Sequence, residues 1–441
     1  MKISVSLSQG IQRTIDITVP AELIEQAYNK RLQEAARTAT INGFQPAKSR
    51  KSPLPIAKVI EHYGPAIRRE VVSEMLQKGF YEALTETKLN PASMPRVEVV
   101  VDQSGADLQF KASFEVFPEI EVKGLDQLVI EKPIASVTDN DLSDMMETLR
   151  KQHAKWDKVE RAAAHEDRVI IDFEGFLQDE KFEGGSANDV PLVLGSKQMI
   201  EGFESGIEGM KAGEVRELNL QFPADYQAEN LAGKAAVFKV TLKEVSAPVL
   251  PALDDELAKL FNVSDIAKLQ KEVRANMERE LEFTLKNKVK DQVMDGLMQH
   301  NTVELPSGLV NDEIKRLKEQ ALQKMGMWQK NKSAEQPELP DELFKDHANR
   351  RVTLGLLMNK VITQNEIKPD ADKVRALVEK MASVYEAPED VVKQFYADRE
   401  QMTEIEQIVV EELVVEKILE SAKVSDKQMS FADVMQQRKP A

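Results

Sequence analysis

Two kinds of hydrophobic pattern share the first 116 residues. Apolar and polar residues alternate in four short runs, which predicts β-strands at residues 3–8, 12–19, 97–101 and 106–116. Elsewhere apolar residues recur every three to four positions, which predicts helices that begin after Pro20 and occupy residues 56–63 and 66–84. We expect a break at Gly64-Pro65 because proline lacks the N–H that a helical hydrogen bond requires. Residues 1–116 are therefore predicted to form an α+β domain.

The next stretch predicts one helix between two linkers. Residues 119–133 and 155–166 carry little hydrophobic pattern and are interpreted as linkers. Thr138 precedes apolar residues at helical spacing, and Asp141, three positions later, completes a capping box with a shortened acid. We therefore expect the helix to begin directly after Thr138.

Residues 168–245 predict a small β-rich domain. This stretch holds about five short β-like runs and nine of the 19 glycines of the chain. Glycine permits the backbone angles of tight turns, so such a density indicates many turns between short strands. We expect this domain to be inserted between helical segments.

From Pro251 onward the pattern is helical. A long helix is expected to begin at Ser264 and to end near His300, with apolar residues every four positions from Leu269 to Leu297. Four residues turn a helix by about 400°, so this stripe drifts by about 40° per step, and the helix must either meet different neighbours along its length or leave part of the stripe uncovered. The further helices expected are residues 306–324, 341–363, 370–383, 388–397 and 401–422.

Composition and charge exclude several classes of protein. A net charge of −16 repels nucleic acid, so any contact with RNA requires a local basic patch. The absence of cysteine excludes disulfides, thiolate metal sites and a cysteine nucleophile. The five histidines are scattered, and no phosphate-binding glycine motif or GxSxG motif occurs, so we expect no cofactor and no metal. No secretory signal is visible and no apolar run is long enough to span a bilayer, so no membrane partner is expected.

The β-rich stretch contains four phrases in a characteristic order. They are VIIDFEGFLQDEKFEGG, LVLGSKQMIEGFESGIEGMKAGE, FPADY and LAGKAAVFKVTLKEV. This order resembles the FKBP-type peptidyl-prolyl isomerase family over about 80 residues. The resemblance implies an apolar pocket that binds a prolyl residue and catalyses rotation about the preceding peptide bond. The alternative interpretation is that the same apolar residues form only the core of the domain.

The resemblance assigns eight residues to this pocket, and they are Phe173, Phe182, Glu183, Met199, Ile200, Phe203, Tyr226 and Phe238. It implies that Met199 and Ile200 meet the proline ring and carbonyl and that Phe203 forms the floor. Three positions differ from the usual family residues, since Glu183 replaces Asp, Met199 replaces Val and Phe203 replaces Trp. The apolar cup is retained.

A basic island occupies the loop at residues 42–55. Residues 41–72 contain six Lys or Arg against two Asp or Glu. Phe44 beside Lys48, Arg50 and Lys51 predicts a loop that docks on RNA phosphates and on an apolar protein surface. The alternative is a solvated loop with Phe44 turned inward.

The whole arrangement resembles the trigger factor family of ribosome-associated bacterial chaperones. Short phrases support this resemblance, and they are LNPA at 89–92, FEVFPE at 114–119, ETLRKQ at 147–152 and NMEREL at 276–281. The implied fold class is multidomain α+β, with an inserted FKBP-like domain and an all-α C-terminal domain of long helices. The implied parts are a ribosome-docking domain at 1–116, a linker and first helix at 117–160, an isomerase domain at 161–246 and a helical chaperone domain at 247–441.

The resemblance also implies a function and partners. It implies an ATP-independent, cytoplasmic chaperone that binds nascent or unfolded polypeptides at the ribosomal exit tunnel and isomerises prolyl bonds. The docking residues would be Gly43, Phe44, Lys48, Arg50 and Lys51, on protein and RNA of the large subunit. The free protein would exchange between monomer and homodimer, and apolar stripes of the C-terminal helices would be either core or client-binding surface.

One alternative function follows from the docking loop. The family loop reads G-F-R-x-G-K-x-P, whereas here Gly43-Phe44 is followed by Gln45, Pro46 and Ala47, and the matching proline is Pro55. The alternative is therefore a chaperone-isomerase that works independently of the ribosome.

Overall fold

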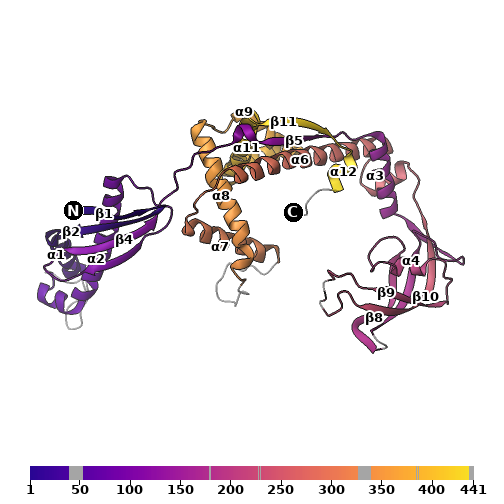
Figure 1. Cartoon of the computed structure of the whole chain (residues 1–441), viewed down its shortest axis with the longest axis horizontal. Helices are drawn as coiled ribbons and strands as arrows, with labels where there is room; N and C mark the ends of the chain where they lie inside the picture. Colours follow the sequence, from indigo (N-terminus) through magenta and orange to yellow (C-terminus); the bar gives the residue numbers. More distant parts are fainter. Residues whose placement is uncertain are drawn as a thin grey trace. The chain divides into compact units, whose positions relative to one another are not determined.

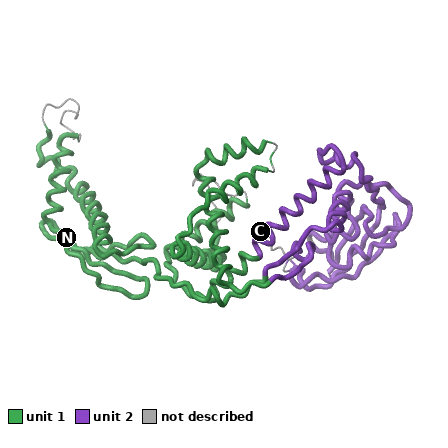
Figure 2. The backbone as a smooth tube through the Cα atoms, turned by 90° about the horizontal axis from the view of Figure 1, so that it is seen from above, with its two compact units in different colours: residues 1–131, 289–425 green, residues 132–288, 426–441 purple. Residues whose placement is uncertain are grey.

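Figure 1 shows the computed structural model of the chain, which divides into two units. It describes residues 1–38, 53–177, 180–226, 228, 230–325, 339–383, 385 and 387–436. Unit 1 comprises Met1–Glu131 and Val289–Ser425, and unit 2 comprises Lys132–Lys288 and Asp426–Ala441 (Figure 2). Within the described residues, none of the helices combines the length and apolar character that a membrane span requires.

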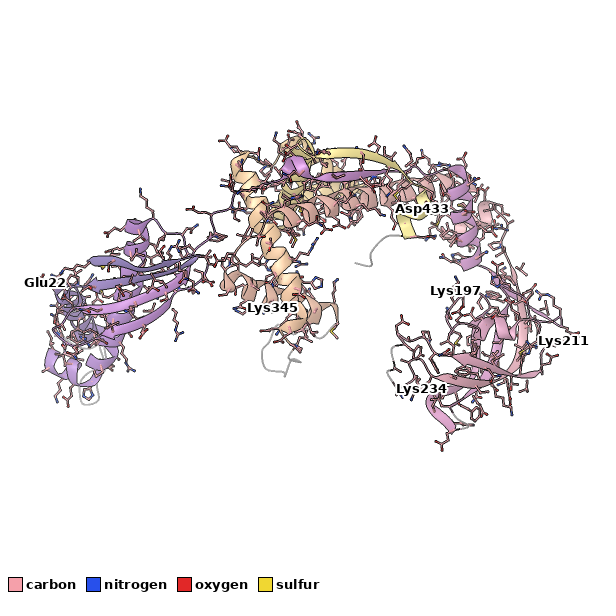
Figure 3. The ribbon with its side chains drawn as sticks, in the orientation of Figure 1. Glu22, Lys197, Lys211, Lys234, Lys345 and Asp433 are labelled. Carbon is pink, nitrogen blue, oxygen red and sulfur yellow. The ribbon has the colours of Figure 1, made fainter. Side chains whose placement is uncertain are left out.

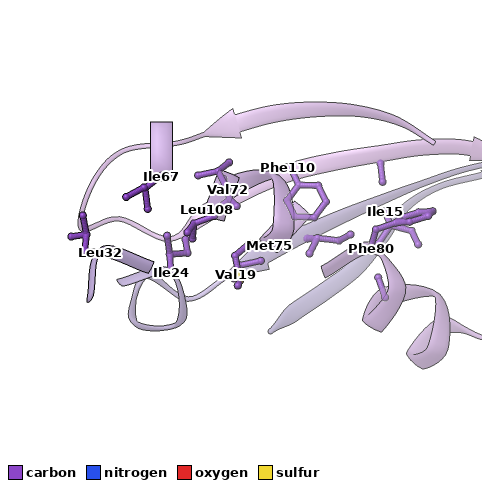
Figure 4. Packing of buried hydrophobic residues seen from close by; sticks show 14 of the residues in the cluster. Ile15, Val19, Ile24, Leu32, Ile67, Val72, Met75, Phe80, Leu108 and Phe110 are labelled. Atoms are coloured by element: carbon purple, nitrogen blue, oxygen red, sulfur yellow. The ribbon is translucent and has the colours of Figure 1, made fainter. Parts of the chain in front are cut away.

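Unit 1 begins with an antiparallel sheet covered by two helices. Strands β1 (Lys2–Gln9), β2 (Gln12–Val19), β3 (Arg96–Val101) and β4 (Leu108–Glu115) form a sheet in the order β1-β2-β4-β3. Helices α1 (Ala21–Thr38) and α2 (Ile56–Thr87) cover one face. The alternation seen in the sequence places Ile15, Val19 and Phe110 on that face, where they are buried (Figure 4). The predicted α+β architecture of this segment is confirmed.

The predicted break in the second helix is wrong. Helix α2 runs without interruption from Ile56 to Thr87, with Pro65 inside it. Packing overrides the local signal, because Val59 and Ile67 on either side of Pro65 are buried in the same core. Gly64 does not break the helix. It allows α2 to lie close to α1, because a Cβ at this position would stand 3.0 Å from the Tyr28 hydroxyl of α1.

The segment interpreted as a first linker is part of a helical core. Leu128 and Ile130 are buried against Val293 and Leu297 of the long helix α6 (Ile266–His300). The preceding backbone is tied to Asn301 just after α6, because the Lys123 N–H donates to its Oδ1 (2.8 Å) and the Lys123 carbonyl accepts from its Nδ2 (3.1 Å). These two hydrogen bonds fix the position of the segment, which its weak hydrophobic pattern does not predict.

The remaining elements of unit 1 are mostly helices, as predicted. They are α7 (Ser307–Lys324), α8 (Glu342–Gln364), α9 (Ala371–Ala382), α10 (Pro388–Ala397) and α11 (Arg399–Leu419). Two smaller cores join α7 to α8 and α9 to α11. The sequence did not predict strand β11 (Lys423–Gln428), which pairs with β5 (Val129–Ile134).

Two helices of unit 2 pack on the first half of α6. Helix α3 (Asp139–Gln152) begins with the predicted capping box, in which Thr138 accepts from the Asp141 N–H (3.3 Å) and the Asp141 carboxylate accepts from the Thr138 N–H (2.8 Å). Helix α5 (Asp255–Leu260) completes this small core, and α12 (Phe431–Gln436) ends the described chain.

The apolar stripe of α6 meets different neighbours along its length, as predicted. Leu269 and Val273 pack with Met146 of α3 and Leu257 of α5. Near the other end of the helix, Val293 and Leu297 belong to the core that contains Leu128. The apolar residues at four-residue spacing therefore pack into two separate hydrophobic cores and do not face a single partner surface.

The β-rich domain of unit 2 is an antiparallel sheet with one short helix. Its strands are β6 (Lys155–Val159), β7 (Arg168–Leu177), β8 (Glu180–Val193), β9 (Val215–Gln221) and β10 (Ala235–Val249), and its helix is α4 (Phe203–Ile207). The sheet order is β6-β10-β7-β8, and β9 pairs with the other part of β10. The second predicted linker is therefore partly wrong, because residues 155–159 form strand β6 on β10.

Candidate active site

An apolar pocket opens in the β-rich domain beside helix α4. Its volume is about 570 Å³, and its lining residues are Phe173, Phe182, Gly184, Gly185, Gln198, Met199, Ile200, Phe203, Phe222, Pro223, Tyr226, Ala228, Leu231 and Phe238. Seven of the eight residues that the sequence assigned to a pocket are among them. The eighth, Glu183, lies in strand β8, and its side chain lies outside the described part of the structure.

Phe238 of β10 is the centre of an aromatic cluster. Its side chain is 5% exposed, and its ring centroid lies 5.4 Å from that of Phe203, 6.1 Å from that of Phe182 and 6.1 Å from that of Phe222. The Phe173 ring lies 5.7 Å from the Phe203 ring in an edge-to-face arrangement. Such edge contacts are the favoured geometry for aromatic rings, so the cluster forms a fixed apolar wall and floor.

Two glycines leave the space that the Phe182 ring occupies beside the strands. A Cβ at Gly175 would stand 2.6 Å from the ring, and a Cβ at Gly185 would stand 2.5 Å from it. Both distances are shorter than any real contact of a Cβ atom. The glycines of this stretch therefore shape the pocket as well as its turns.

The opposite wall comes from the loop that precedes α4. Met199 and Ile200 are half-buried there and line the pocket. No described residue accepts a hydrogen bond from the Ile200 N–H, whereas the Ile200 carbonyl accepts from the Phe203 N–H (3.1 Å). The loop therefore offers a free backbone donor beside an apolar surface. Tyr226, which is 37% exposed, packs on Phe222 at the rim with ring centroids 4.8 Å apart.

A buried carboxylate sits behind this loop. Glu204, the second residue of α4, is 8% exposed and accepts hydrogen bonds from the backbone N–H groups of four loop residues. The donors are Gly195 (2.7 Å), Lys197 (3.1 Å), Gln198 (2.8 Å) and Met199 (3.2 Å). Burial by itself raises the pKa of Glu204, but the backbone donors outweigh burial and hold the pKa below its usual value of 4.5.

The sequence missed some residues of this site. Phe222, Pro223, Ala228 and Leu231 line the pocket but were not assigned to it. Phe222 and Pro223 begin the FPADY phrase, so the same motif that supplied Tyr226 contained a signal for them. Glu204 follows the assigned Phe203 directly, and nothing in its sequence context indicates a buried acceptor.

The predicted docking loop lies outside the described residues. Residues 39–52 include Gly43, Phe44, Lys48, Arg50 and Lys51. The described chain resumes before α2, where Leu54 is buried and its N–H donates to the Ala36 carbonyl of α1 (2.8 Å).

An antiparallel sheet with one short helix and an aromatic pocket between them defines the FKBP class of peptidyl-prolyl isomerase. The family model for FKBP-type peptidyl-prolyl cis-trans isomerase matches residues 159–243. The models for the bacterial trigger factor protein and for its C-terminus match residues 1–149 and 265–420. The chain belongs to the trigger factor family.

Relatives of this family match the chain from end to end. A trigger factor of Pseudoalteromonas atlantica is 45% identical over 437 residues, which cover 99% of each chain. One from Pseudomonas fluorescens is 46% identical over 443 residues, which cover 100% of this chain and 99% of the relative. A solved structure described under the words "Promiscuous Substrate Recognition in Folding and Assembly Activities of the Trigger Factor Chaperone" covers 95% of this chain and 99% of its own, at 17% identity and a TM-score of 0.48.

Family membership gives the chain its function. It is an ATP-independent chaperone that binds nascent polypeptides at the ribosome, and it is a peptidyl-prolyl cis-trans isomerase of the FKBP type. The match over the whole chain favours this function over the ribosome-independent alternative.

Proposed function

We propose that prolyl isomerisation takes place in the aromatic pocket of the β-rich domain. The residues assigned to it are Phe173, Phe182, Glu183, Met199, Ile200, Phe203, Tyr226 and Phe238. The observation that carries this proposal is the cavity of about 570 Å³, which seven of these residues line. An open cavity of this kind argues against the interpretation that the aromatic residues only fill the core.

The chemistry of the reaction suits such a pocket. Rotation about a peptide bond meets a barrier of about 18–20 kcal/mol because resonance gives the C–N bond partial double-bond character. The charge-separated resonance form is stabilised by water, so moving an X–Pro amide into an aromatic cup weakens that form and favours the twisted state. The free N–H of Ile200 would hold the peptide by a carbonyl oxygen while the bond turns.

The pocket is tested by removing its floor. Phe203→Ala opens the buried cluster, and we expect kcat/KM for an X–Pro peptide to fall by at least about tenfold. Phe176→Ala is the matched control, because Phe176 lies on the same strand as Phe173 but does not line the pocket. Suppression of aggregation of an unfolded client should persist in both variants. Equal isomerase activity in Phe203→Ala and the unchanged protein would refute the assignment of the pocket.

We further propose that the loop at residues 43–51 docks on protein and RNA beside the exit tunnel. Its docking residues are Gly43, Phe44, Lys48, Arg50 and Lys51. The support is electrostatic, because a basic island in a chain of net charge −16 is the part that phosphates attract. The cations give salt-sensitive attraction, and Phe44 adds an apolar contact.

Ribosome cosedimentation at two salt concentrations tests this docking. Changing Lys48, Arg50 and Lys51 to Ala should abolish the salt-sensitive part of binding. The matched control changes three basic residues of α2 to Ala, namely Lys58, Arg68 and Arg69. This control variant removes the same number of positive charges. Two of the three residues already form salt bridges within the domain, Lys58 with Glu61 (2.7 Å) and Arg68 with Asp102 (2.6 Å). Equal binding by the two triple variants would argue against the loop.

We propose that the C-terminal helices present the client-binding surface. Large apolar side chains are exposed on them, and these include Phe283 of α6 (58%), Leu343 of α8 (66%) and Tyr396 of α10 (50%). Scattered apolar groups among charges suit weak, reversible capture of unfolded chains. Changing Phe283 and Leu343 together to Ser should weaken suppression of aggregation without altering isomerase activity. Unchanged suppression would move the client surface elsewhere.

The domain boundaries and the state of the free protein complete the proposal. The domains are residues 1–116, 117–160, 161–246 and 247–441, which keeps the buried residues of the N-terminal core and those of the β-rich core (Ala163 to Val245) each within one segment. The free protein is cytoplasmic and exchanges between monomer and homodimer. Sedimentation over a range of protein concentrations measures that exchange, and a constant monomer mass would exclude it.

A further inference from the structure

The loop from residue 195 to residue 199 is organised around one side chain. Five donors of this loop converge on the Glu204 carboxylate, namely four backbone N–H groups and the Ser196 hydroxyl (3.3 Å). Oε2 accepts from Gly195 and Lys197, and Oε1 accepts from Ser196, Gln198 and Met199. The carboxylate therefore occupies the centre that the loop encloses.

Other backbone contacts of the loop are few. The Ser196 N–H donates to the Val193 carbonyl (3.2 Å), which closes the turn at the end of β8. Gly195 and Lys197 have φ of +92° and +57°, so the chain bends through left-handed conformations that direct successive N–H groups inward. Without an acceptor at the centre, four inward N–H groups would lose their only partners among the described residues.

The same loop continues into the wall of the pocket. Met199 donates to Glu204 through its N–H and lines the pocket with its side chain, and Ile200 follows it. On the other side Glu204 is the direct neighbour of Phe203, which is buried at 2% exposure as the pocket floor. One carboxylate thus links the wall to the floor.

We propose that Glu204 is a positioning residue of the isomerase site, which holds the Met199–Ile200 wall at a fixed distance from Phe203. This inference rests on the proposed function of the pocket. Glu204 itself lies behind the wall and does not line the cavity, so it acts on the substrate only through the loop. A fixed wall matters because the geometry of a bound peptide is part of what lowers the barrier.

The ionised carboxylate is the form that fits this place. A carboxylate is an acceptor at both oxygens, and here both oxygens accept at least two hydrogen bonds. In Glu204→Gln one of the two positions becomes an NH₂ group that faces N–H donors of the loop. The side chain keeps its size, so the packing of Phe203 and Ile207 on the apolar side is retained while the loop loses part of its anchor.

The test compares Glu204→Gln with Glu201→Gln in the full-length chain. Glu201 lies three residues earlier, is exposed and has no hydrogen-bond partner among the described residues, so its variant removes the same charge without touching the anchor. For an X–Pro peptide followed by exchange NMR, we expect kcat/KM to fall by about tenfold in Glu204→Gln and to stay within about twofold in Glu201→Gln.

Two readouts separate positioning from a general loss of folding. A partly unfolded population lowers kcat and leaves KM unchanged, whereas a displaced wall raises KM in the molecules that remain folded. Hydrogen exchange of the unchanged protein should show protected amides at residues 195 and 197–199 and a fast amide at Ile200. In Glu204→Gln that protection should be lost, while strands β7 and β10 keep theirs.

The outcomes are distinct from those that test the pocket itself. Unprotected amides at 197–199 in the unchanged protein, or unchanged kcat/KM and KM in Glu204→Gln, would overturn the role of Glu204 even if Phe203→Ala abolishes activity. Full activity in Phe203→Ala would instead overturn the pocket assignment.

Discussion

The Phe182 side of the pocket depends on the absence of a side chain at residue 185. In Gly185→Ala the new Cβ would stand 2.5 Å from Cζ and 2.6 Å from Cε2 of Phe182, whereas ordinary contacts begin at 3.4 Å. The ring must therefore move by about 1 Å. The φ of Gly185 is not in the left-handed region, so alanine is tolerated by the backbone and the perturbation is purely steric.

The magnitude follows from the contacts that the ring would lose. The Phe182 ring packs edge-on against Phe222 (5.9 Å) and Phe238 (6.1 Å). Each aromatic pair contributes about 0.5–1.5 kcal/mol, so displacement weakens the closed wall by about 1–3 kcal/mol. Because the bound peptide needs that wall in the twisted state, kcat/KM is expected to fall by between about fivefold and about 150-fold.

The assay is isomerisation of an X–Pro peptide by the full-length protein, with Gly209→Ala as the control. Gly209 does not line the pocket, has a φ of +80°, and a Cβ there meets nothing within 4 Å, so its variant strains the backbone by about 1–2 kcal/mol without touching the ring. The steric argument fails if Gly185→Ala keeps full activity, or if both variants lose the same activity.

Three further outcomes are expected. Asn301→Ala leaves the N–H and carbonyl of Lys123 without their partners and should destabilise the helical core of unit 1 by about 1–3 kcal/mol in urea unfolding; an unchanged midpoint would mean that water replaces the amide. Thr138→Ala removes the N-cap of α3 and should cost about 1 kcal/mol, seen as faster hydrogen exchange in its first turn, whereas unchanged exchange there would deny the cap any role. The pKa of Glu204 is lower in the folded chain than its usual 4.5, so its contribution to the stability of the β-rich domain is present above about pH 4.5 and is lost as pH falls through the folded pKa. Unfolding of the domain from about pH 6 down to pH 3 should show this loss in the unchanged protein and a shallower one in Glu204→Gln, and parallel curves would contradict it.

Much of the pocket was predictable because its residues follow short phrases of fixed order. The motif supplied Phe173, Met199, Phe203 and Phe238, and the structure brings them to one cavity. The anchor at Glu204 was not predictable, because nothing local distinguishes a buried acceptor from an exposed acid. Its role arises only when the loop folds back and directs its donors at one point.

The sequence by itself determined the elements that local forces specify. Alternation set the strands of the N-terminal sheet, helical spacing set the long helices, and Thr138 with Asp141 set the start of α3. These signals act between residues a few positions apart, so they are visible in the order of residues alone.

Only the tertiary structure decided which local signals hold. Helix α2 continues through Pro65 because buried neighbours on both sides fix it to the sheet. The weakly patterned segment before α3 is ordered by Asn301, which lies 178 residues from its partner Lys123. Contacts at such separations in sequence produce no periodic pattern of apolar residues, so they cannot be predicted from the sequence alone. Their free energy outweighs the local conformational preference where they bury apolar side chains and also give buried polar groups a hydrogen-bond partner.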